Sequence, residues 1–288
     1  MDTQERGVQI RTPATANLMV DSADRVRRQT TRADNFLITK NQSILNGFFN
    51  RIGTTEVVVE WNLPNVSPNT NNNTIQVFVT GAPANPYTIT LQNNLYTIAD
   101  ALNAIVAGLN ALALGSNFTI AASPTGATIT SSAATFQFQG GGSNLLGQLG
   151  LPDAPGVALT QTANRRLANL QNNIRYLDFV SEQLTYNQEL KDDSTNSYQR
   201  SVLCRWYMAY DNPVPDDAYG FPILMGYRPF KLRRLFSPAK QIKWNMAQPI
   251  GQLSFQVYTD QGGLLTQTYG LFQPQLFEWL MTLQASEN

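Results

Sequence analysis

Two pairs of adjacent carboxylates are the residues of this 288-residue chain that come closest to a catalytic pattern, Asp192 with Asp193 and Asp216 with Asp217. Two neighbouring carboxyl groups can act as the acid and base of a glycosidase or bind calcium. Both pairs stand among turn-forming residues, at 191–196 and 213–217, where adjacent acids are usually hydrated loop residues. We therefore predict no catalytic, cofactor-binding or metal-binding residues at either pair.

The chain contains no histidine. Histidine is the commonest general acid or base and the commonest ligand of transition metals. Ser-His-Asp and Cys-His nucleophile systems therefore cannot be built, and one cysteine cannot replace histidine in a zinc site. Because only carboxylate chemistry or a Ser-Lys arrangement remains, we expect that the protein is not an enzyme and carries no cofactor.

A glycine run and the single cysteine also lack the pattern of a chemical site. Residues 140–144 read Gly-Gly-Gly-Ser-Asn, without the spacing of a phosphate-binding loop, and predict a flexible turn. Cys204 stands in the apolar run 202–206, which predicts a buried thiol. One cysteine also excludes a disulfide framework within the chain.

Charge is scarce and balanced. Charged residues make up 14% of the chain, with 20 basic and 20 acidic side chains, where about 25% charged residues are typical. Nucleic-acid-binding proteins normally carry a basic surplus, whereas residues 1–40 hold seven basic side chains against five acidic ones. We therefore expect no strong nucleic-acid binding. A net charge of zero also removes the self-repulsion that opposes association.

We expect neither a signal peptide nor a membrane span. The first residues, 1–6, are polar, and no stretch approaches the roughly 20 apolar residues that a transmembrane helix needs. We expect synthesis in the cytoplasm or nucleus of a host cell.

Strand patterns occupy most of the chain. The β-branched run 54–61 predicts one strand, and six more are predicted after residue 155, at 174–184, 202–210, 231–236, 241–245, 251–259 and 276–283. Recurrence every ten to twenty residues with turn formers between is typical of a β-sandwich or barrel. The expected core or interface anchors are Trp206, Tyr207, Trp244 and Trp279.

A compact unit interrupts these strands. Strands are predicted at 75–79, 87–91, 118–120, 127–130 and 135–138, and a short helix at 144–149. The apolar spacing over 97–112 predicts an amphipathic helix with Thr97 as its N-cap and Gly115 near its end. We expect this helix to cover one face of a small antiparallel sheet. Since the strand at 54–61 precedes the unit, we interpret the unit as an insertion into one sandwich.

Three groups of segments resemble a known family. They are 21–25 with 36–38 and 45–48, then 55–65, then 241–244 with 250–260. Together they resemble the minor capsid, or penton, proteins of virophages, polinton-like viruses and related double-stranded DNA viruses with jelly-roll capsids. The resemblance implies a single jelly roll, often with an inserted domain, in a protein of which five copies fill each fivefold vertex. It carries no catalytic residues.

With this resemblance, the expected fold is mainly β, a single jelly-roll β-sandwich with an inserted small α+β domain. The expected divisions are an extended N-terminal arm at 1–50, the sandwich at 51–66 and 153–288, and the insertion at 67–152. The expected function is that of a structural capsid protein of the virion, a penton or minor capsid protein. It would self-associate as a homopentamer and contact other capsid proteins, such as a major capsid protein, through the arm.

Three alternatives stay open. A major capsid protein of a small virus would differ in its copy number per virion. A carbohydrate-binding adhesin or spike could stack sugars on Tyr87, Tyr96 or Trp279, which a glycan array would reveal. For a hydrolase that uses carboxylates alone, substitution of the four aspartates at 192, 193, 216 and 217 would abolish a detected activity.

Overall fold

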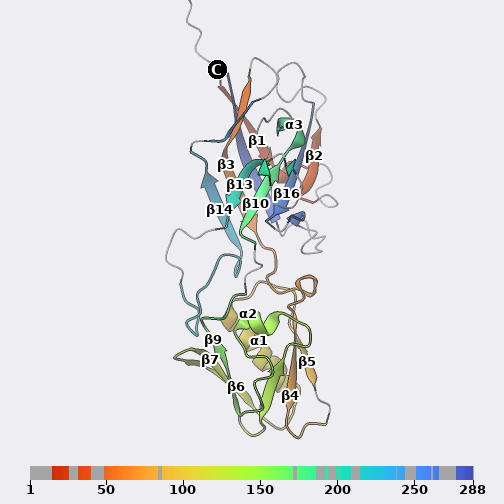
Figure 1. Cartoon of the computed structure of the whole chain (residues 1–288), viewed down its shortest axis with the longest axis vertical. Coiled ribbons are helices and arrows are strands. Elements are labelled where there is room, and N and C mark those ends of the chain that lie inside the picture. Colours follow the sequence, from red (N-terminus) through yellow and green to blue (C-terminus); the bar gives the residue numbers. More distant parts are fainter. Residues whose placement is uncertain are drawn as a thin grey trace, which may run out of the picture.

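The chain forms two lobes placed end to end, a β-sandwich and a smaller α+β lobe (Figure 1). The computed structural model describes residues 15–25, 32–39, 49–83, 86–170, 174–185, 192–193, 199–200, 202–208, 215–237, 239–243, 251–260, 262–265 and 277–287. Strands dominate both lobes, so the mainly β fold class predicted from the sequence is confirmed.

Two antiparallel sheets make the sandwich. The first sheet runs in the order β1 (Thr15–Asp21), β17 (Phe277–Ser286), β3 (Arg51–Trp61) and β14 (Phe230–Leu235), and β15 (Gln241–Lys243) also pairs with β3. The second sheet runs β13 (Val202–Tyr207), β10 (Tyr176–Val180), β16 (Gln252–Thr259) and β2 (Asn35–Thr39). Strict alternation along β17 turns Phe277, Trp279, Met281 and Leu283 into the core between the sheets.

The pairing of the eight main strands is that of a jelly roll. The first strand pairs with the last (β1 with β17), the second with the seventh (β2 with β16), the third with the sixth (β3 with β14) and the fourth with the fifth (β10 with β13). These four pairs are those of one long antiparallel hairpin. When this hairpin folds over into two sheets, β17 also pairs with β3, and β10 also pairs with β16. The jelly-roll prediction therefore agrees with the strand order.

The same pairing explains where the second lobe arises. Because β3 pairs with β14 and β10 with β13, the β3–β10 and β13–β14 connections leave the sandwich at one end. Both enter the second lobe, whose core includes Val66 and Leu170 from the first connection and Phe221 and Tyr227 from the second. Residues 153–170 and 221–227, assigned to the sandwich from the sequence, thus supply core residues of the second lobe.

Two three-stranded sheets build the second lobe, not the one sheet expected. One has the order β5 (Tyr87–Thr90), β4 (Thr74–Val79), β8 (Phe136–Gln139), and the other β6 (Phe118–Ser123), β7 (Gly126–Ser131), β9 (Thr160–Asn164). The helices are α1 (Ile98–Ala111) and α2 (Leu145–Leu149). The sequence did not predict β9, because its buried side chains are the polar Gln161 and the small Ala163. Gln161 donates to the carbonyls of Phe136 and Gly156.

Helix α1 begins where the sequence predicted. The Thr97 hydroxyl accepts a hydrogen bond from Asp100 N, and the Asp100 carboxylate accepts one from Thr97 N, which completes a capping box. Its buried residues include Leu102, Ile105 and Leu109, which face the core of the second lobe.

The N-terminal segment is not an arm throughout. Residues 15–21 form β1, which pairs with β17 over its whole length, and Val20 and Phe36 lie in the sandwich core. The arm predicted for 1–50 is therefore wrong for β1, β2 and the short helix Ser22–Asp24 between them. Residues 1–14 lie outside the described part of the chain.

The remaining elements are short. They are a 3₁₀ turn at Pro68–Thr70, α3 (Glu182–Thr185), and the pair β11 (Asp192–Asp193) and β12 (Gln199–Arg200). The predicted strand at 174–184 divides into β10 and α3, because Thr185 turns back to hydrogen-bond the Ser181 carbonyl through both its N–H and its hydroxyl.

Candidate functional site

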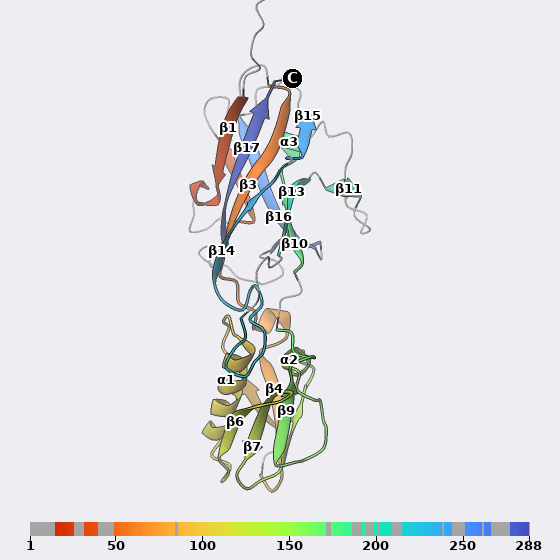
Figure 2. The same cartoon turned by 90° about the vertical axis from the view of Figure 1, so that its left-hand side faces the viewer.

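The two aspartate pairs lie in different parts of the structure. Asp217 contacts α1 of the second lobe, whereas β11, which contains Asp192 and Asp193, lies beside the sandwich (Figure 2). The Asp217 carboxylate accepts hydrogen bonds from the backbone N–H groups of Ala99, Tyr219 and Phe221, at 2.9, 2.9 and 3.0 Å. Since Ala99 is the second residue of α1, Asp217 caps this helix together with Thr97.

The described ranges were searched for metal clusters and for helices that could cross a membrane. There, no group of three or more Asp, Glu, Cys or His side chains is arranged to hold a metal ion. No helix among these residues has both the length and the apolar composition that crossing a bilayer requires.

Cys204 lies in the sandwich core, as its apolar neighbours predicted. Burial raises the pKa of its thiol from 9.0 to about 12. The folded protein therefore keeps the thiol protonated at neutral pH, and this group is a poor nucleophile.

We expect native Cys204 to react with iodoacetamide at pH 8 at least about 100-fold more slowly than the urea-unfolded chain. Because the pKa of the thiol is raised in the folded state, the protonated thiol contributes to the free energy of unfolding. This contribution is complete below pH 9 and is lost as the pH rises from 9 toward 12. Labelling followed by mass spectrometry measures the rate. Equal rates in the folded and unfolded chain would show that the thiol is accessible.

Of the aromatic residues proposed as sugar platforms, Trp279 is excluded. It is 2% exposed, and its ring packs on Phe36, Phe179 and Phe255 with centroids 5.6, 5.1 and 5.7 Å away. Its indole N–H donates to the Ala33 carbonyl at 2.7 Å. Tyr87 and Tyr96 are half-buried in the second lobe.

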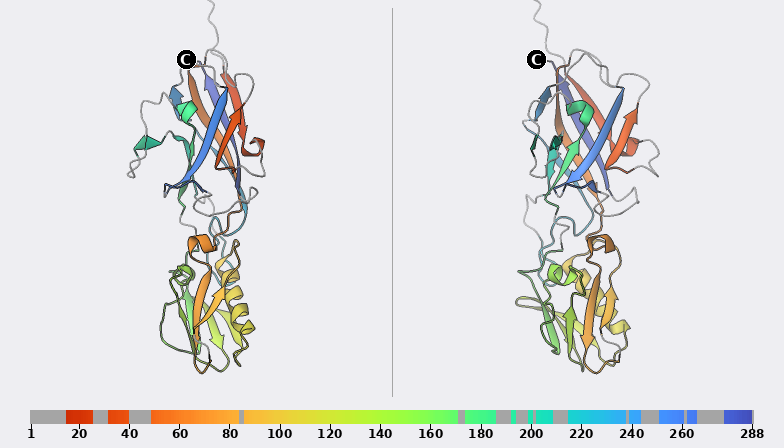
Figure 3. Two further views of the ribbon diagram at one scale, coloured as in Figure 1. Left: turned by 90° about the vertical axis from the view of Figure 1, so that its right-hand side faces the viewer. Right: turned by 45° about the vertical axis from the view of Figure 1, so that its right-hand side comes forward.

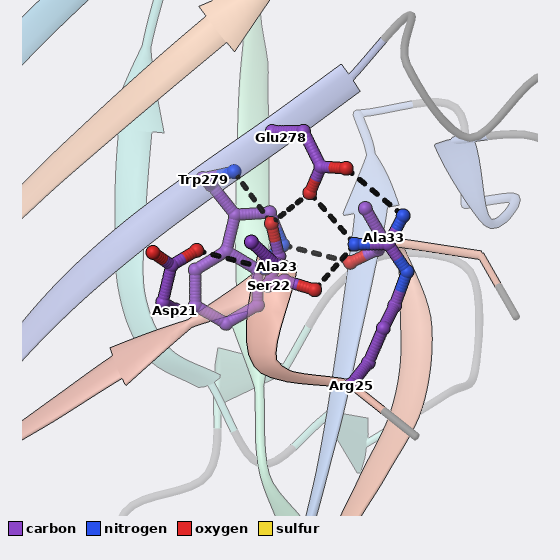
Figure 4. Close-up of polar contacts among 7 residues, drawn as sticks. All are labelled: Asp21, Ser22, Ala23, Arg25, Ala33, Glu278 and Trp279. Carbon is purple, nitrogen blue, oxygen red and sulfur yellow. Dashed lines mark hydrogen bonds and ion pairs between the residues drawn. The ribbon is translucent and has the colours of Figure 1, made fainter. Parts of the chain in front are cut away.

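A buried polar cluster fixes the N-terminal segment to β17 (Figure 4). The Arg25 guanidinium, fully buried, makes two hydrogen bonds to the Glu278 carboxylate, at 2.7 and 2.9 Å, and a third to the Ser22 carbonyl. The Ser22 hydroxyl donates to Glu278 and accepts from Trp279 N. These contacts attach residues 22–25 to β17.

Polar and aromatic residues gather on the outer face of the second sheet. We call Tyr176, Asp178, Arg205 and Tyr207 the tyrosine patch. Arg205 pairs with Asp178 through Nε at 2.7 Å and Nη2 at 3.0 Å, and its guanidinium carbon lies 3.9 Å from the centroid of the Tyr176 ring. The hydrogen bond to Asp178 is the largest cause of the raised pKa of Arg205.

The outer face of the first sheet carries a hollow of about 310 Å³. Val58 of β3 and Leu280 of β17 are paired across these strands and both point outward into it. The hollow is lined by Asp21, Ala23, Val58, Glu60, Lys231, Glu278, Trp279 and Leu280. Three of these eight residues are acidic and one is basic.

Sequence reasoning missed both surfaces. Tyr176 and Asp178, like Arg205 and Tyr207, are two residues apart, which places each pair on one face of its strand. The alternation was therefore visible, but the pairing of β10 with β13 that joins the two halves was not. Of the predicted anchors, Trp206 and Trp279 are buried, Tyr207 is exposed, and Trp244 lies outside the described residues.

Comparison with known proteins gives structural similarity only. No family model matches the chain, and no curated protein matches it. Among solved structures, the selenomethionine-labelled mavirus penton protein is similar with 13% identity and a TM-score of 0.48, over 96% of this chain and all of that one. A chain of the Sputnik virophage structure from cryo-EM is similar with 13% identity and a TM-score of 0.45, over 95% and 98%. The mavirus protein is a penton protein, the kind of protein that the sequence segments resemble.

Proposed function

We propose that this chain is a structural protein of a viral capsid, a penton or minor capsid protein, and that it works through contacts rather than catalysis. The observation that carries the proposal is the jelly-roll sandwich whose two longest excursions leave at one end. Because the second lobe extends the long axis of the molecule (Figures 1 and 3), it leaves the outer faces of both sandwich sheets uncovered. Several copies can therefore lie side by side with their second lobes on the same side.

The surface of the sandwich supports association between copies. Among the described residues, each outer face carries two exposed large apolar side chains, Met19 and Leu235 on the first sheet and Leu37 and Tyr207 on the second. The chain as a whole has zero net charge, so copies do not repel one another electrostatically.

The start of β1 supports a contact with neighbouring shell proteins. Thr15 pairs with Ser286, which in turn pairs with Arg51, so all three lie at the end of the sandwich opposite the second lobe. We propose that the residues before Thr15, which are joined to the sandwich at this end, bind other capsid proteins.

The mass of the purified assembly tests the proposal. We expect the chain to form a closed ring of five copies, five times the chain mass of 31.9 kDa, measured by mass photometry and sedimentation velocity. A chain that stays monomeric at high concentration and never co-sediments with shells of its virus would contradict the proposal. A ring of another size would keep the self-association and reject the pentamer.

A further inference from the structure

The tyrosine patch has the composition of an interface anchor. Tyr207 is 56% exposed at the end of β13 and packs edge-on against Tyr176, with ring centroids 5.8 Å apart. Asp178 beneath them is 3% exposed and holds Arg205 in place. Tyrosine and arginine are among the residues enriched at the positions that dominate binding energy, and here both are fixed before any partner arrives.

The hollow on the opposite face has complementary chemistry. Its lining combines the apolar residues Val58 and Leu280 with the acidic residues Asp21, Glu60 and Glu278. Glu278 also accepts hydrogen bonds from Arg25 and Ser22. Lys231 is its one basic lining residue, and this residue pairs with Glu60. Carboxylate oxygens accept hydrogen bonds from phenol and guanidinium groups, which the tyrosine patch presents.

We propose that the tyrosine patch of one copy docks into the hollow of the next copy, with the exposed ring of Tyr207 over Val58 and Leu280. This inference rests on the proposed self-association and names the two surfaces that carry it. The patch and the hollow lie on opposite outer faces of the sandwich, so the contact is head-to-tail. A head-to-tail contact closes into a ring when the rotation between neighbours divides a full turn, which a capsid vertex requires.

Two single substitutions remove one surface each. Tyr207→Asp places a carboxylate opposite Asp21, Glu60 and Glu278, and Val58→Lys fills the hollow with a charged chain. Both side chains point outward, so we expect the circular dichroism spectrum and the urea midpoint to stay close to those of the unmodified chain. Leu280→Lys, on the paired position of β17, replaces Val58→Lys if the latter fails to fold. Leu167→Asp, at an exposed apolar residue of the second lobe, is the matched control.

Sedimentation velocity of each variant and of a 1:1 mixture gives the decisive result. We expect Tyr207→Asp and Val58→Lys each to need at least about 30-fold higher concentration than the unmodified chain to assemble. Mixed, they share one intact patch and one intact hollow, so they should form dimers that grow no further. Leu167→Asp should form rings like the unmodified chain.

These measurements distinguish a wrong docking contact from a wrong proposal of self-association. If the unmodified chain forms rings and either variant assembles equally well, the patch and the hollow are not the interface, although self-association stands. Variants that are both monomeric and give no dimers when mixed would also overturn the head-to-tail contact. An unmodified chain that never assembles, alone or with shells, would overturn both proposals.

Discussion

Replacing Arg25 with methionine is expected to lower the free energy of unfolding by about 3–5 kcal/mol. The variant leaves the Glu278 carboxylate, whose side chain is 12% exposed, without its two hydrogen bonds from Arg25. It also removes the side-chain donor to the Ser22 carbonyl. An uncompensated charge in so enclosed a place costs several kilocalories per mole. Urea unfolding followed by circular dichroism measures the change.

The matched control is Lys231→Met, which breaks the exposed pair with Glu60 on the same sheet and should cost less than about 1 kcal/mol. The double variant Arg25→Met with Glu278→Met should recover part of the loss, because no unpaired charge remains. Equal effects of Arg25→Met and Lys231→Met would show that burial of the Arg25 pair has no energetic consequence.

Replacing Asp217 with alanine is expected to lower the free energy of unfolding by about 2–3 kcal/mol. Three backbone N–H groups, on Ala99, Tyr219 and Phe221, lose their acceptor at once, and α1 loses a negative charge at its N-terminus. Because Asp217 ties the β13–β14 connection to α1, hydrogen exchange should rise in residues 217–227 before it rises in the sandwich.

Asp216→Ala is the control for this variant, since Asp216 is the adjacent aspartate and is exposed. Its replacement should change stability by less than about 0.5 kcal/mol. Similar losses from Asp216→Ala and Asp217→Ala would mean that the charge of the loop, and not the capping contacts, determines its stability.

The elements that the sequence predicted well carry their own local signals. Helix α1 has a capping residue, an apolar stripe and a length of several turns, so its range 97–112 agrees with Ile98–Ala111 within a residue at each end. Strand β16 was predicted at 251–259 from strict alternation and spans Gln252–Thr259. In both cases the residues that decide the structure are neighbours in the chain.

The elements that it missed depend on distant partners. Strand β1 presents Thr15, Asn17 and Met19 to solvent and only Val20 fully to the core, so its sequence resembles a polar arm. Its pairing with β17 and the contact between Arg25 and Glu278, 253 residues apart, hold it in the sheet. No local pattern records a partner so far along the chain.

The candidate site, too, could be predicted from the sequence only where local residues decide it. The absence of histidine and the turn setting of the aspartates favour a protein that works through contacts. Exposure then separated Tyr207 from Trp279, which look alike in the sequence as aromatic residues of predicted strands. Which aromatic side chain faces solvent depends on the register of its strand, and long-range pairing sets that register.

The position of β17 in the first sheet has a consequence for synthesis of the protein. This strand is the last to leave the ribosome among the described elements, yet it occupies a central place between β1 and β3. Until it is made, β1 lacks its partner and β3 has an open edge in the middle of the sheet, where other chains could pair. Since β17 also supplies Leu280 and Glu278 to the hollow, a nascent chain cannot offer the proposed docking surface early. Translation would thus separate folding from assembly in time, so that only chains with a closed sandwich could join a growing shell.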